Sequence, residues 1–126
     1  MIINISIPRV PVGPNGPKGL LRMHWSKRRK LKWGWETEIL YALRTSADYA
    51  NWVVSPATID QRRRVTIRQY RKRLFDRDNL FTSCTPLINA MKGILIRDDS
   101  EKWLSLHVYQ EKSRDERTEI TVEDCT

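Results

Sequence analysis

The chain has 126 residues, about the size of one domain, and 40% of them are hydrophobic, which excludes a disordered tail. No apolar run approaches the roughly 20 residues that a bilayer span requires, so we expect no membrane partner. The formal net charge of +8 is uneven: residues 1–75 hold 16 Lys and Arg against 4 acids, whereas residues 76–126 hold 7 against 11. The basic half predicts a polyanionic partner such as nucleic acid, and the acidic half predicts a bound cation. Solubility alone is the alternative reason for the excess of basic residues.

The first half of the chain predicts a strand, a loop and a long helix. β-branched residues favour a strand over residues 2–7, and four prolines and three glycines indicate a loop over residues 8–20. From His24 the pattern becomes helical, with Ser26 as the expected N-cap and Pro56 as the end of the region. One apolar stripe recurs at every fourth position of this helix, at Leu31, Trp35, Ile39 and Leu43.

The second half predicts three strands and one helix. Alternating residues indicate a strand over residues 65–72. A helix is expected from Asp78 or Asn79 to about Lys92, with a kink or a locally irregular turn at Pro86 and a stop at Gly93. Two further strands, over residues 103–110 and 118–123, are expected to pair as a hairpin. The whole order predicts one α+β domain, 1–126, in which two main helices pack against a mixed β-sheet of about four strands.

The run before the second helix contains two carboxylates, Asp76 and Asp78. In an extended segment such residues point the same way and can face one ion. Hard cations such as Mg²⁺ prefer oxygen ligands and keep several waters, so two or three carboxylates suffice to bind one. There are two alternatives. Asp78 can cap the following helix, and Asp76 can form a surface ion pair with Arg73 or Arg77.

Residues on and after the second helix are also relevant to this acid pair. A looped path after the helix would bring Asp98 or Asp99 beside the acid pair. Cys84 lies on the apolar stripe of the second helix and is expected in the core rather than as a nucleophile. The opposite, polar face of that helix carries Asp78, Thr82, Thr85 and Asn89.

Three runs together resemble the RusA family of Holliday junction resolvases: DRDNL at residues 76–80, LINAM at 87–91 and GILIRDD at 93–99. Residues 21–29 resemble the basic, tryptophan-containing start of the first helix in phage-type members. The resemblance implies a cytoplasmic, bacterial or phage-encoded homodimer that binds four-way DNA junctions and cuts them by paired, symmetric nicks. It also implies Mg²⁺ as cofactor, with Mn²⁺ as a substitute, and no organic cofactor. The family's essential acids fall on Asp76, Asp78 and Asp99, with Asp98 as a neighbour able to assist.

Two positions depart from the family pattern. Thr85 stands where members commonly have a lysine, and Asn89 stands where many have an acid. A cation at the first position could neutralise the phosphate in the transition state, so its absence predicts weaker cutting. Lys92 or Arg77 could supply the missing charge. The alternative function is therefore a junction-binding protein with weak or no cleavage.

Two sets of basic residues are expected to contact DNA phosphates. One set adjoins the acid pair and the second helix: Arg71, Lys72, Arg73, Arg77 and Lys92. The other lies on the first helix: Lys27, Arg28, Arg29 and Lys30. Alternate strand residues such as Arg64 and Arg68 could instead form a solvated face. Phe75 could wedge into a branch point or lie in the core, and three tryptophans of the first helix, Trp25, Trp33 and Trp35, are expected to pack.

Overall fold

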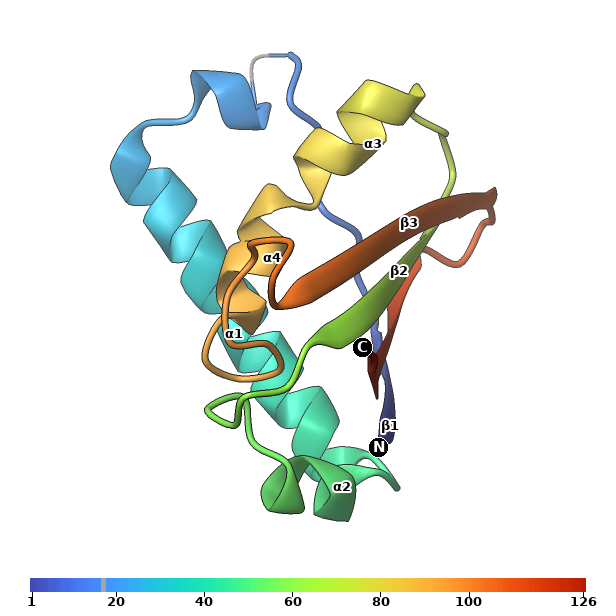
Figure 1. The fold of residues 1–126 in the computed structure, drawn as a ribbon. Helices are drawn as coiled ribbons and strands as arrows, with labels where there is room; N and C mark the ends of the chain where they lie inside the picture. The colour runs from blue at the N-terminus through green and yellow to red at the C-terminus, as the bar shows by residue number, and fades with distance from the viewer. Residues whose placement is uncertain (17) are drawn as a thin grey trace.

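The computed structural model describes every residue except Pro17 and shows a four-stranded mixed sheet with α1 and α4 on one face (Figure 1). The strands are β1 (Ile2–Ile7), β2 (Arg63–Arg71), β3 (Leu104–Lys112) and β4 (Arg117–Asp124). The sheet and its helices confirm the predicted α+β class, and the bounds of β1 agree with the sequence.

The order of the strands is β1-β4-β2-β3, which corrects the predicted hairpin. β4 pairs antiparallel with both β1 and β2, while β3 pairs parallel with β2 on the far side. Residues 118, 120 and 122 of the central strand β4 are all buried, whereas the residues of the edge strand β3 beyond Leu104 are half-buried or exposed.

The first helical region contains two helices, α1 (Trp25–Thr45) and α2 (Tyr49–Val54). The predicted stripe is confirmed, because Trp35, Ile39 and Leu43 are fully buried and Leu31 packs against them. The N-cap differs from the prediction. The Nδ1 atom of His24 accepts a hydrogen bond from the Ser26 N–H at 3.2 Å, so His24 caps α1. A 3₁₀ turn, η1 (Leu20–Arg22), precedes it.

The second helical region is interrupted just before Pro86, in agreement with the irregular turn that was one of the two expectations there. α3 (Arg77–Ser83) and α4 (Thr85–Met91) meet at Cys84, which is buried as predicted. Pro86 lies in the first turn of α4, where its missing N–H has no helical partner to lose. Gly93 ends the region as predicted: its φ of +82° suits glycine, and its N–H donates to the Ile96 carbonyl at 2.8 Å.

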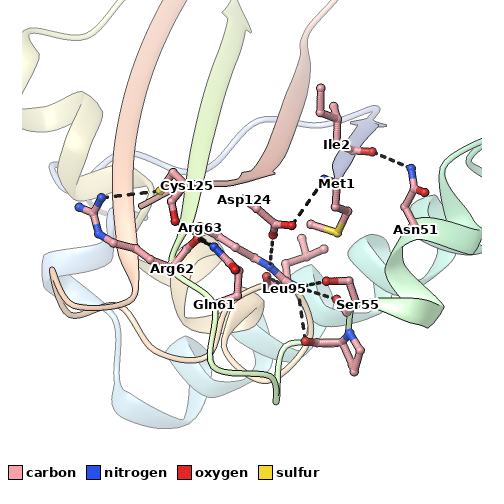
Figure 2. A network of polar contacts seen from close by, with 11 residues as sticks. Met1, Ile2, Asn51, Ser55, Gln61, Arg62, Arg63, Leu95, Asp124 and Cys125 are labelled. Carbon is pink, nitrogen blue, oxygen red and sulfur yellow. Dashed lines mark hydrogen bonds and ion pairs between the residues drawn. The ribbon is translucent and has the colours of Figure 1, made fainter.

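One buried arginine joins β2 to the elements around it (Figure 2). The Arg63 side chain donates to the carbonyl oxygens of Leu95 at 2.8 Å and Ser55 at 2.6 Å. It also forms an ion pair with Asp124 of β4 at 3.3 Å. Arg63 is therefore a structural centre of the fold rather than a surface cation.

The outer face of the sheet is polar and balanced in charge. Arg64 pairs with Glu123 at 3.4 Å and Arg68 with Glu111 at 3.6 Å, so these arginines form a solvated face with acids as partners.

Across the described residues, no helix combines the length and the apolar character needed to cross a membrane.

Candidate functional site

The acid pair lies at the start of α3. Asp76 is the N-cap: its Oδ1 accepts from the Asn79 backbone N–H at 2.9 Å, and its Oδ2 accepts from the Asn79 side-chain amide at 3.1 Å. Asp78 lies in the first helical turn, so the pair is not in the extended segment that the sequence predicted. The cap is Asp76, and not Asp78 as the alternative proposed. Both carboxylates are exposed.

Four basic residues lie close to the pair along the chain, but one of them, Arg71, is buried inside the fold. Lys72, Arg73 and Arg77 are exposed, and among the described residues neither arginine forms an ion pair with Asp76. Arg71 is buried and donates to the Pro11 carbonyl and to the Gln69 side-chain oxygen, each at 2.9 Å. Burial lowers the pKa of this guanidinium. Arg71 is therefore not available as the DNA contact that the sequence predicted.

Phe75 is held between the sheet and the N-terminal loop. Its N–H donates to the Gln110 side chain at 3.0 Å, and the Gln110 amide donates back to its carbonyl at 2.7 Å. The guanidinium of Arg71 lies 3.9 Å from the centre of its ring. Packing, rather than a wedge into DNA, is the role that these contacts support. They also place Asp76 beside the distal end of β3.

The other acids lie at the opposite end of β3. Asp99 precedes that strand and lines a surface hollow with Arg62, Glu101 and Leu104. Leu104 and Gln110 are six positions apart, or about 20 Å along a strand. Among the described residues, no three acids, histidines or cysteines lie close enough to hold a metal ion. The expected approach of Asp98 or Asp99 to the acid pair is therefore not found within one chain.

Asp99 has a partner of its own. Lys92 lies 3.1 Å from its carboxylate, and the hydrogen bond from Lys92 lowers the pKa of Asp99. Lys92 is thus paired at the far end of β3 and does not supply the cation that Thr85 lacks.

A groove of about 520 Å³ lies between α1 and the α3–α4 pair. It contains the predicted polar face of the second helical region, with Thr82, Thr85 and Asn89 on one wall. The Thr82 hydroxyl donates to the Asp78 carbonyl at 3.0 Å, so the groove begins one helical turn from the acid pair. The opposite wall is basic and carries Arg28, Arg29 and Lys32, with Trp33 beside them. We call this space the α1 groove.

Three tryptophans of α1 were predicted to pack in the core, and two of them, Trp25 and Trp33, are instead largely exposed. Trp35 is fully buried, whereas 62% of Trp25 and 53% of Trp33 are exposed. The guanidinium of Arg29 lies between them, 4.9 Å from the Trp25 ring centre and 6.0 Å from that of Trp33. The sequence held a signal for this, because Trp25 and Trp33 do not fall on the four-residue stripe that contains Trp35.

The donor chemistry at the acid pair fits a hard divalent cation. Mg²⁺ keeps several waters and binds one or two carboxylates together with substrate phosphates, and Asp76 and Asp78 provide two exposed carboxylates. The third acid of the implied site does not join them in a single chain. A scan against models of protein families finds no match to this chain, and a search of curated proteins finds none either.

Proposed function

We propose that the protein is a branched-DNA endonuclease of the RusA type, which acts on four-way junctions as a homodimer and uses Mg²⁺ held by Asp76 and Asp78. The observation that carries the proposal is the exposed acid pair together with the exposed cations Lys72, Arg73 and Arg77, which adjoin it along the chain. Carboxylates would repel a phosphate unless a metal ion and neighbouring cations offset their charge. A two-fold dimer would present two equivalent sites to a junction of similar symmetry.

Each residue has a distinct part in this proposal. Lys72, Arg73 and Arg77 bind the phosphates on either side of the bond to be cut. Asn79 orients the Asp76 carboxylate through its backbone and side-chain N–H groups. The metal ion would lower the pKa of a bound water and offset charge on the phosphate. The basic start of α1, at Lys27, Arg28, Arg29 and Lys30, would extend the contact along the DNA.

Cleavage of a labelled four-way junction in Mg²⁺ tests this proposal. Asp76→Asn should abolish nicking, because an amide binds a hard cation poorly but still accepts the capping hydrogen bond. Asp115→Asn is the matched control, since Asp115 is 88% exposed and is not one of the proposed metal ligands. Nicking of the same junction at the same rate by both variants would contradict the assignment.

Junction binding without efficient cleavage is the second candidate, and two observations favour it. Thr85 places a hydroxyl, not an ammonium, on the wall of the α1 groove, and Asp99 is paired with Lys92 near the start of β3 rather than beside the acid pair. Stable junction binding with no nicks in either Mg²⁺ or Mn²⁺ would favour this function. Thr85→Lys would then be expected to raise the cleavage rate, because it adds the absent cation.

A further inference from the structure

We propose that the exposed start of α1 binds the unpaired bases of a DNA strand, with Trp25 and Trp33 as stacking platforms and the α1 groove as the site of the adjoining phosphates. The inference rests on the nucleic-acid part of the proposed function and is independent of cleavage. We call Trp25, Arg29 and Trp33 the tryptophan ladder.

Geometry is the first support. The three members of the ladder are spaced by four residues, so they follow one another along α1 at a rise of about 6 Å per step. More than half of each indole is exposed, although an indole is among the side chains that gain most from burial. Arg29 lies between the two rings as a cation–π partner of both, which orders them without covering them. Exposed, ordered aromatic faces are what a base needs for stacking.

Charge beside the ladder is the second support. Trp33 and Arg29 also line the α1 groove, together with Arg28 and Lys32. Arg28 is fixed there by two hydrogen bonds to the Leu20 carbonyl, at 3.0 and 2.6 Å, and Lys32 pairs with Glu36 at 3.5 Å. A base on Trp33 would place its phosphates against this basic wall. A groove of about 520 Å³ falls in the range of about 300–1,000 Å³ that small ligands occupy.

The same charges argue against a second copy of the chain as the occupant. An interface around a two-fold axis brings a patch onto its own copy, so the cations of this patch would face one another. The unfavourable pairs would come from Lys27, Arg28, Arg29, Lys30 and Lys32. A DNA strand has the complementary charge. Its path can also continue along α3, because Thr82 joins the groove to the first turn that holds Asp78.

Fluorescence anisotropy tests the inference with three labelled probes in EDTA: a 12-nucleotide oligo-dT, a duplex and a four-way junction. Trp25→Leu and Trp33→Leu should each weaken oligo-dT binding by about tenfold, because each removes one stacking face. Trp33→Phe keeps a ring and should retain most of the affinity. Tyr41→Leu is the matched control: Tyr41 is 69% exposed on the same helix, about 12 Å beyond Trp33, and should leave binding unchanged.

The outcomes separate this inference from the proposed function. Loss of oligo-dT binding in the tryptophan variants but not in Tyr41→Leu supports the inference. Equal binding by wild type and by both tryptophan variants overturns it, as does a wild type that binds junction and duplex but not oligo-dT. A wild type that binds none of the probes overturns the proposed function as well. If the leucine variants change from dimer to monomer in ultracentrifugation, the ladder is a subunit interface and the inference fails.

Discussion

Asp76 combines a structural and a proposed chemical role in one side chain. Both of its oxygens accept hydrogen bonds from Asn79, which fixes the start of α3, and each oxygen keeps a lone pair for a cation. A loss of activity in a variant could therefore reflect either the cap or the charge. The choice of replacement separates them, because asparagine is as good an N-cap as aspartate whereas alanine is a poor one.

We expect Asp76→Ala to lower the free energy of unfolding by about 1 kcal/mol, and Asp76→Asn to change it by less than about 0.5 kcal/mol. Urea denaturation measures both values. Equal destabilisation by the two replacements would show that the charge of Asp76, rather than its cap, stabilises the start of α3.

The pair of Lys92 with Asp99 predicts a pKa difference. Lys92→Met should raise the pKa of Asp99 towards its ordinary value, because the hydrogen bond from Lys92 is the first cause of its lowering. The pKa of Asp99 is lower in the folded protein than in the unfolded chain. The stability that this contact contributes is therefore complete above the ordinary carboxylate pKa and is lost as the pH falls through the lower, folded-state pKa. Carbon-13 NMR titration of the Asp99 carboxyl in the wild type and in Lys92→Met measures the change. An unchanged Asp99 titration would contradict the pairing.

At the scale of elements, much of the fold could be predicted and the strand order could not. The stripe of α1, the break near Pro86 and the stop at Gly93 all follow from local chemistry that the sequence displays. The insertion of β4 between β1 and β2 joins strands that lie far apart along the chain, and local residue patterns do not reveal such pairings. The short connection between β3 and β4 favoured a hairpin, but in the structure β2 lies between these two strands.

The site was predicted less completely than the fold, for a similar reason. The acid pair, the polar face of the second helix and several exposed cations were found because their residue types and spacings are local. The separation of Asp99 from Asp76 depends on the direction of β3, which runs parallel to β2. Arg71 was assigned to DNA because it shortly precedes the acid pair along the chain, and only the fold reveals its buried partners.

Arg63 joins β2, β4 and two loops, so its removal should affect all of them. We expect Arg63→Met to lower the free energy of unfolding by about 3–5 kcal/mol. The change leaves the carbonyl oxygens of Leu95 and Ser55 without this donor, and it leaves Asp124 with the N-terminal ammonium of Met1 as its remaining ion-pair partner. Arg64→Met is the matched control. Its pair with Glu123 is exposed and should contribute about 0–1 kcal/mol. Urea denaturation compares the two, and equal losses would contradict the central role of Arg63.

For the whole molecule, the two thiols offer a measure of global unfolding. Burial raises the pKa of Cys84 to about 11, whereas Cys125 is only partly buried. At pH 8 a disulfide reagent should modify Cys125 readily and Cys84 only when the core opens, since the thiolate is the reactive form. Mass spectrometry of the labelled peptides distinguishes them. Modification of both thiols at one rate in the absence of denaturant would contradict the closed core.

The raised pKa of Cys84 also makes the free energy of unfolding depend on pH. The folded state keeps Cys84 protonated while the unfolded chain ionises it near pH 9, so stability from this group is complete below pH 9 and is lost as the pH rises towards 11. Denaturation curves between pH 8 and 11 should fall more steeply for the native chain than for Cys84→Ala. Parallel curves would show that the buried thiol contributes nothing.

The position of β4 also bears on how the molecule forms during synthesis. Among the described strands β1 pairs with β4 alone, and more than a hundred residues separate the two along the chain. Until β4 is made, the β1 segment lacks its partner strand, and once β2 is made its β4-facing edge stays open as well. From the synthesis of β2 to that of β4 the nascent chain therefore carries two unsatisfied strand edges, which is the period in which a chaperone would have most to protect.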